Sequence, residues 1–233
     1  MGPAAIIAKA RNENRAALDE LSGKQLLAGF GVNVPKSMMV SNAAGAAQAV
    51  AKLKPPFVVK VMSPDLLHKS DAGGVKVNLK STAEVEQAIT AMAQSPQIKA
   101  ARIDGYLIEE MAPAGQEIVI GAVRDPDFGP LVMVGLGGIF VEMLADVAFR
   151  ICPITRLDAA EMLVELKGAA MLQGARGRPP VAQDAIIDVL LKIGGADGLL
   201  IRHADDFKEA DINPLIVSAT GAVAVDARFI LTD

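Results

Sequence analysis

Apolar residues recur at helical spacing from residue 4 to about residue 30, and Gly31 marks the end of this region. Within it, Ser22 is followed three positions later by Gln25, a spacing typical of a capping box. We therefore predict two helices, the second of which begins at Ser22. The run SMMV, residues 37–40, then has the length and apolar character of a short strand.

Beyond this point, strand-like and helix-like patterns alternate. The predicted strands are PPFVVKVMS, GVKVNL, GYLIEEMA, QEIVIGAVRD and GPLVMVGLGG, and the predicted helices are SNAAGAAQAVAKL, STAEVEQAITAMAQ, LDAAEMLVEL and VAQDAIIDVLLKI. A turn containing Pro113 and Gly115 joins GYLIEEMA to QEIVIGAVRD. The segments ADINPLIVS and AVAVDARFIL, separated by Thr-Gly, predict a terminal antiparallel hairpin.

The length and composition of the chain bound its fold. A chain of 233 residues lies near the upper end of one domain or the lower end of two joined lobes. We expect two lobes, residues 1–112 and 113–233. Apolar residues make up 52% of the chain but aromatic residues only 3%, so the core must consist of Ala, Val, Leu, Ile and Met. This composition suits an α/β fold.

Charge and cysteine content argue against several classes of protein. The net charge is −4 and no long basic run occurs, so the electrostatic footprint of a nucleic-acid-binding protein is missing. No apolar stretch is long enough to span a bilayer, and we see no secretory leader. Cys152 is the only cysteine, so we expect a packing role for it and a cytoplasmic location for the protein. His203, among charged residues, is expected on the surface.

Lys60 lies in the middle of the apolar strand FVVKVM. An ammonium in such a strand is costly unless a negative or polar group reaches it, so we expect an anion nearby. The alternative is an edge strand from which the lysine side chain extends to water.

The segment SPDLLHKSDAGGVK combines a histidine, His68, with a glycine pair, Gly73 and Gly74. Glycines let backbone N–H groups converge on an oxyanion, and Lys69 and Lys76 could add positive charge, so a phosphate-binding loop is one interpretation. A plain Gly-Gly turn between two strands is the other.

Acidic residues cluster in LIEEMAPAGQE and near the C-terminus. Glu109, Glu110 and Glu117 could accept hydrogen bonds from ribose hydroxyls or an amino group, or could form a solvated acidic rim. Asp211 and Asn213 share one face of a predicted strand, and Asp226 lies on the next strand. Three oxygen donors of this kind suit Mg²⁺ better than zinc, although a polar turn without metal would have the same pattern.

A second glycine cluster occurs in GLGGIFVEMLADVAFR. It could form another anion-facing turn. It could equally form a tight turn followed by Glu142, Asp146 and Arg150 as a helical charge ladder.

Taken in order, these motifs resemble the ATP-grasp domain of the ADP-forming acyl-CoA synthetases. This family includes ADP-forming acetate–CoA ligase and is related to succinyl-CoA synthetase. The resemblance covers nearly the whole chain through five ordered motifs: SGKQLLAGFGVNVP, PFVVKVMSPDLLHKSDAGGVKVNL, LIEEMAPAGQEIVIGAVRDPDFGP, GLGGIFVEMLADVAFR and DINPLIV. It implies an ATP-grasp fold, with ATP or ADP held between two mixed α/β lobes, and Mg²⁺ as cofactor.

The resemblance also implies roles for individual residues. It assigns Lys60 to the phosphates, the Gly73-Gly74 loop to a cover over them, Glu109 to the adenine-binding hinge, Glu117 to the ribose, and Asn213 and Asp226 to the metal, with Asp211 a weaker metal candidate. In the family, a phosphoryl group travels through a phosphohistidine on the CoA-binding subunit, and the histidine of the HKSD motif is implicated as a second carrier. His68 matches it, and neutral imidazole is a competent nucleophile near pH 7. A histidine that only caps or packs is the alternative.

The family's CoA-binding Rossmann domain has no counterpart in the sequence, because no G-x-G-x-x-G follows a strand. We therefore expect a hetero-oligomer with an α subunit that carries the principal phosphohistidine, or a place within a longer fused polypeptide. One rival function is a non-catalytic, nucleotide-sensing domain of a protein acetyltransferase. Another is a stand-alone ATP-grasp ligase, for which we identify no substrate pocket. The presence of His68 favours the synthetase.

Overall fold

A computed structural model describes residues 2–66, 69–138, 145–174 and 179–232. The chain forms two compact units, a small unit of residues 35–112 and a large unit of residues 1–34 and 113–233. The division differs from the expected lobes in one respect, because the first 34 residues join the large unit. Ile6, Ile7, Leu26 and Leu27 explain this difference, since they are buried in the core of the large unit.

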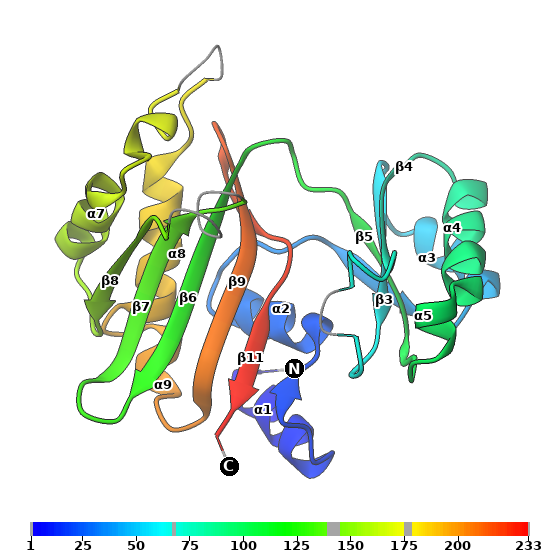
Figure 1. The fold of residues 1–233 in the computed structure, drawn as a ribbon, viewed down its shortest axis with the longest axis horizontal. Coiled ribbons are helices and arrows are strands. Elements are labelled where there is room, and N and C mark those ends of the chain that lie inside the picture. The colour runs from blue at the N-terminus through cyan, green and yellow to red at the C-terminus, as the bar shows by residue number, and fades with distance from the viewer. Residues whose placement is uncertain (1, 67–68, 139–144, 175–178, 233) are drawn as a thin grey trace. The chain divides into compact units, whose positions relative to one another are not determined.

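The small unit is a four-stranded antiparallel sheet with helices packed on one face (Figure 1). Its strands, in spatial order, are β2 (Ser37–Val40), β5 (Gly105–Glu110), β3 (Phe57–Met62) and β4 (Val75–Leu79). Its helices are the 3-10 helix η1 (Ala43–Gly45), α3 (Ala46–Val50), α4 (Thr82–Gln94) and α5 (Pro96–Lys99). Helix α4 begins where the sequence predicts, because the Ser81 hydroxyl accepts a hydrogen bond from the Glu84 amide at 3.2 Å.

The large unit has a seven-stranded antiparallel sheet within the described residues. Its spatial order is β1 (Ala17–Leu18), β11 (Arg228–Leu231), β9 (Phe207–Ser218), β6 (Gln116–Asp125), β7 (Gly129–Leu136) and β8 (Val147–Ile151), with β10 (Gly221–Ala224) also paired to β9. Its helices are α1 (Pro3–Asn12), α2 (Glu20–Gly29), α7 (Arg156–Glu165), η2 (Ala169–Met171), α8 (Gln183–Gly194) and α9 (Leu199–Arg202).

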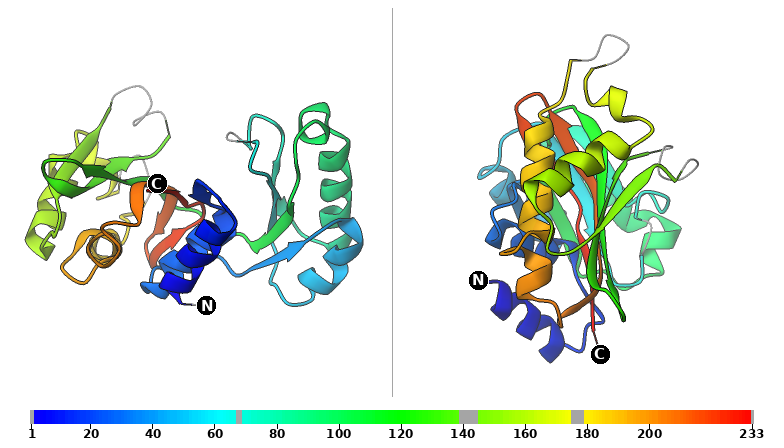
Figure 2. Two further views of the ribbon diagram at one scale, coloured as in Figure 1. Left: turned by 90° about the horizontal axis from the view of Figure 1, so that it is seen from below. Right: turned by 90° about the vertical axis from the view of Figure 1, so that its left-hand side faces the viewer.

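One face of the large sheet forms the apolar core. Ile120, Ile212 and Phe229 from three neighbouring strands are buried together with Leu26 of α2 and Ile186 of α8, and Figure 2 shows the helices along this face. Because side chains alternate across a strand, the residues between these apolar positions point to the opposite face. That second face carries the polar groups considered below.

One local prediction and one of the open alternatives are wrong. Helix α2 begins at Glu20 and is capped by Asp19, whose carboxylate accepts a hydrogen bond from the Ser22 amide at 2.8 Å. The predicted short connection between β5 and β6 is present, and the two strands belong to different sheets. Arg150 lies on strand β8 and pairs with Glu165 of α7, so it is not part of a helical charge ladder.

Gly23 lets α2 approach the segment before β11 very closely. A Cβ atom added at Gly23 would lie 2.8 Å from the backbone oxygen of Ala227. At an exposed helical site, replacing glycine by alanine stabilises a protein by about 1 kcal/mol. At Gly23 we expect the opposite sign, a loss of roughly 1–3 kcal/mol, because the added methyl group overpacks the contact.

Urea denaturation of Gly23→Ala, followed by circular dichroism, measures this change. Gln25→Ala, at an exposed position of the same helix, is the matched control and should change the free energy of unfolding by less than about 0.5 kcal/mol. A stabilised Gly23→Ala variant would contradict the close contact.

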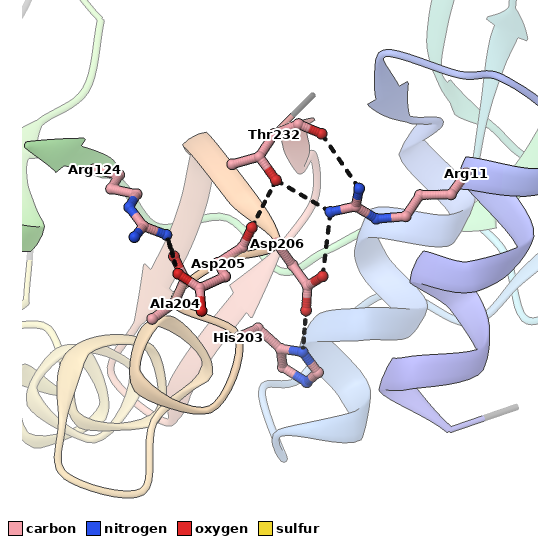
Figure 3. A network of polar contacts seen from close by, with 7 residues as sticks. All are labelled: Arg11, Arg124, His203, Ala204, Asp205, Asp206 and Thr232. Carbon is pink, nitrogen blue, oxygen red and sulfur yellow. Dashed lines mark hydrogen bonds and ion pairs between the residues drawn. The ribbon is translucent and has the colours of Figure 1, made fainter. Parts of the chain in front are cut away.

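A polar network ties the N-terminal helix to the end of the chain (Figure 3). Arg11 of α1 donates hydrogen bonds to Asp206 at 3.3 Å and to the Thr232 hydroxyl at 3.1 Å. Nδ1 of His203 lies 2.9 Å from the same Asp206 carboxylate, and its ring packs edge-on against Phe30. The expectation of a surface histidine is wrong, since only 14% of the His203 side chain is exposed.

None of the helices in the described parts of the chain combines the length and apolar character needed to cross a membrane. Cys152 is buried, as its expected packing role requires, and burial raises the pKa of its thiol to about 12.

Candidate functional site

Lys60 forms a buried ion pair on the small sheet. Its Nζ atom lies 3.1 Å from Oε2 of Glu109, and the two side chains are 9% and 2% exposed. The predicted need for a nearby anion is confirmed. The edge-strand alternative is wrong, because β3 lies between β5 and β4.

The glycine pair lies in the connection between the antiparallel neighbours β3 and β4. At Gly74 the glycine has a packing reason, since an added Cβ would lie 2.4 Å from a methyl carbon of Val61. Gly73 has a positive φ of 71°, and an added Cβ there would meet no described atom within 4 Å. Gly74 therefore fits the plain-turn interpretation, whereas the open Gly73 is the position at which a ligand could approach the backbone. His68 lies outside the described residues.

The three acidic residues of the LIEEMAPAGQE motif have different surroundings. Glu109 pairs with Lys60, and Glu110 accepts a hydrogen bond from the Lys54 amide at 3.0 Å. Glu117 lies on β6 of the large unit and is exposed. Its backbone oxygen accepts a hydrogen bond from the Gly137 amide at 2.8 Å, so the second glycine cluster begins beside Glu117.

Asp211, Asn213 and Asp226 come together on the large unit. Ala210 and Ile212 of β9 point into the core, so Asp211 and Asn213 lie on the opposite face. Two strands share one edge of β9, since β10 pairs with residues 215–218 and β11 with residues 207–211. The connection between them therefore runs along this edge of β9, where the Val225 amide donates a hydrogen bond to the Pro214 oxygen at 3.1 Å, next to Asn213. Asp226 lies in this connection, not on a strand as predicted.

The charges in this group favour a cation. Burial raises the pKa of the Asp211 carboxyl, and the negative charges of Asp226 and Glu209 raise it further. The positive charge of Arg228 and a hydrogen bond from Asn213 act in the opposite direction. Because Asn213 donates its amide N–H to Asp211, its side-chain oxygen faces elsewhere as an acceptor.

Asn213 and Asp226 could hold Mg²⁺ together with ligands that do not come from the chain. In the described ranges, no three His, Cys, Asp or Glu side chains are grouped closely enough to hold a metal by themselves. A cation here would therefore use the oxygens of Asn213 and Asp226 together with water or phosphate oxygens, which is the usual way that Mg²⁺ binds in nucleotide sites. The carboxylates of Asp211 and Asp226 repel each other, and a divalent cation bound beside them would reduce this repulsion.

Arg228 is a residue that the sequence pattern did not single out. It is exposed at the start of β11 and lies directly opposite Asp211 in the strand register. Residues paired in this way point to the same face, so a positive charge accompanies the proposed metal ligands. The signal was its position two residues after Asp226, in the motif DAR.

A family model described as an ATP-grasp domain matches residues 9–231. The chain belongs to the ATP-grasp domain family. The structural neighbours agree: a Ca. Korarchaeum cryptofilum dinucleotide forming acetyl-coenzyme A synthetase 1, in complex with coenzyme A, Ca-AMPCP and HgCl⁺, has a TM-score of 0.91 and 38% identity to this ATP-grasp chain. The match covers 98% of this chain and 99% of that one, so the predicted ATP-grasp fold is confirmed.

One further relative and a second structure of the same synthetase bear on function. The β subunit of acetate–CoA ligase (ADP-forming) I from Pyrococcus furiosus is 43% identical over 228 residues, which cover 97% of this ATP-grasp chain and 96% of that subunit. A second structure of the Korarchaeum synthetase holds Mg-AMPPCP and coenzyme A, with a phosphohistidine segment pointing towards the nucleotide binding site. It covers 99% of this chain, with 37% identity and a TM-score of 0.84.

Proposed function

We propose that this chain is the nucleotide-binding β subunit of an ADP-forming acyl-CoA synthetase. With its partner it would catalyse acyl-CoA + ADP + phosphate ⇌ carboxylic acid + ATP + CoA. The observation that carries the proposal is the 43% identity, over nearly the full length of both chains, to the β subunit of an ADP-forming acetate–CoA ligase. The match covers 97% of this chain and 96% of that subunit, so it extends through both units of the fold.

The sequence resemblance assigns nucleotide-binding roles to residues of both units. On the small unit, Lys60 would bind phosphate oxygens and the loop containing Gly73 and Gly74 would cover them. On the large unit, Glu117 would bind the ribose, and Asn213 and Asp226 would hold Mg²⁺. When bound, Mg²⁺ would neutralise charge on the polyphosphate. The contribution of the chain is therefore mainly to hold and orient the nucleotide.

His68 would carry the phosphoryl group to ADP. In the direction of ATP formation, its neutral imidazole nitrogen would attack the phosphorus of the partner's phosphohistidine, so that one P–N bond forms as the other breaks. An oxygen of the ADP β-phosphate would then attack the same phosphorus. This second step forms the new P–O bond of ATP and returns a neutral imidazole.

The partner would supply the acyl-CoA chemistry. The relative from Pyrococcus furiosus is named as a subunit, which implies that an α subunit completes that enzyme. We expect the same division here, with coenzyme A and the principal phosphohistidine on the α subunit. The rival function, a non-catalytic nucleotide sensor, is less well supported, because two relatives of similar length are named as β subunits of ADP-forming acetate–CoA ligases.

Reconstitution tests this function. The chain is mixed with the CoA-binding α subunit from the same organism, acetyl-CoA, ADP, phosphate and Mg²⁺, and ATP is measured with luciferase. We expect ATP only when both proteins and all substrates are present. The proposal fails if the chain binds ADP but the pair makes no ATP from acetyl-CoA or from a series of other acyl-CoA thioesters, and that outcome would favour the sensor.

A further inference from the structure

The buried pair of Lys60 and Glu109 has a well-defined place on the small sheet. Val58 of β3 lies opposite Glu109 of β5, and Lys60 lies opposite Leu107. Val59 and Ile108 point into the helix-covered core, so Lys60 and Glu109 both point to the other face of the sheet. They are diagonal neighbours there, which accounts for the 3.1 Å contact between Nζ and Oε2.

Stability alone does not account for this pair. Removing two charges from water is costly, and replacing a buried ion pair by apolar side chains of similar volume is often neutral or stabilising. On the same face of the sheet, Leu107 and Met62 are apolar and buried, at 0% and 4% exposed, so an apolar pair would suit these two strands. A functional reason for keeping the two charges is therefore needed.

We propose that Glu109 is a positioning residue, which holds the Lys60 ammonium in place for the nucleotide phosphates instead of contacting adenine. This proposal rests on the proposed function, since it assumes that Lys60 binds phosphate. It differs from the adenine-hinge role that the sequence resemblance implies for Glu109.

Burial of the Glu109 carboxylate keeps it paired with Lys60. The Glu109 side chain is 2% exposed, so the carboxylate keeps its counterion whether or not nucleotide is bound, because a lone buried carboxylate would be strongly unfavourable. An ammonium has three N–H donors and can serve a carboxylate and a phosphate together. Glu109 would thus fix the position of Lys60, while the phosphate would approach from another side of the ammonium.

The experiment compares two ligands that differ only in their phosphates. Dissociation constants for ADP with Mg²⁺ and for adenosine are measured by calorimetry on the full chain, with wild type, Glu109→Gln and Glu109→Leu. We expect Glu109→Leu to weaken ADP binding about tenfold or more and adenosine binding less than about twofold. Glu109→Gln keeps an oxygen acceptor for Lys60 and should restore ADP affinity to within about threefold of wild type.

Two further variants separate positioning from folding. Glu110→Gln, at the neighbouring carboxylate, is the matched control and should change neither affinity by more than about twofold. If Glu109→Leu does not fold, the double variant Lys60→Met/Glu109→Leu replaces both charges with apolar groups. We expect it to unfold at a urea concentration no lower than wild type, yet to bind ADP at least about tenfold more weakly and adenosine normally.

The outcomes distinguish the two levels of the proposal. If Glu109→Leu weakens adenosine and ADP equally, Glu109 contacts the base, and the positioning role is overturned while the proposed function stands. Full ADP affinity in the double variant would also overturn it. If wild type binds neither ligand, the proposed function itself fails.

Discussion

Replacing Asp226 with asparagine is expected to weaken ADP binding about 100-fold in the presence of Mg²⁺ and to leave it nearly unchanged in the presence of EDTA. The change keeps the shape of the side chain but removes the negative charge that would hold the cation. A metal ion contributes several kcal/mol to interactions with phosphates, and each 1.4 kcal/mol corresponds to about a factor of ten in affinity. Calorimetric titration of ADP, with and without Mg²⁺, measures both values.

Variants of two residues on β9 serve as comparisons for Asp226→Asn. Asp211→Asn should have a smaller effect than Asp226→Asn, because Asp211 already receives a hydrogen bond from Asn213 and is only a weaker candidate for the metal. Glu209→Gln, on the same strand, should change Mg²⁺-dependent affinity less than about threefold. Equal losses with and without Mg²⁺ in Asp226→Asn would show that the carboxylate does not act through a metal, and the proposed ligand set would then be wrong.

The elements of the fold that depend on local pattern are predicted well from the sequence. The apolar run around Lys60 forms β3, and Ser81 caps α4, because burial and capping are decided within a few residues along the chain. The α2 cap shows the limit of this reasoning. Asp19 and Ser22 both have side chains suited to an N-cap. The buried pair of Lys24 and Glu20, 2.8 Å apart, includes the first turn in the helix, so Asp19 is the cap.

The pairing of strands could not be predicted in this way. Strands β5 and β6 are joined by a short connection, which suggests a hairpin, yet they do not pair: β5 pairs with β2 and β3, and β6 pairs with β7 and the distant β9. The sheet that a strand enters depends on which apolar faces can be buried together, and this is a property of the whole chain. The same reason places the first 34 residues with the large unit, since their apolar side chains complete its core.

The candidate site was predictable in its chemistry but not in its geometry. The burial of Lys60 indicates that an acidic partner exists, but only the register of β3 against β5 selects Glu109 over Glu110. In the same way, the spacing of Asp211 and Asn213 predicts one face of a strand. The approach of Asp226 depends on the break between β10 and β11 beside residues 212–214 of β9, which the hairpin pattern does not contain.

Replacing His68 with alanine should reduce ATP formation by the reconstituted enzyme at least about 1,000-fold, while ADP binding stays within about twofold of wild type. The imidazole would be the nucleophile that receives the phosphoryl group, and an alanine methyl group has no atom that can take its place. The His68 side chain would bind the phosphoryl group during its transfer and would not hold the bound nucleotide. The loss should therefore appear in kcat and not in the KM for ADP.

Labelling with γ-³²P-ATP gives the second readout for His68. Wild-type chain should acquire a label that is stable in base and lost in acid, as expected of a phosphoramidate, and His68→Ala should acquire none. His203→Gln is the matched control, because it removes the only other histidine of the chain while keeping a donor for Asp206. Normal turnover in His68→Ala would mean that the phosphoryl group passes directly between ADP and the partner's phosphohistidine. In that case the chain would only position the nucleotide, and the segment containing Gly73 and Gly74 would serve to cover it.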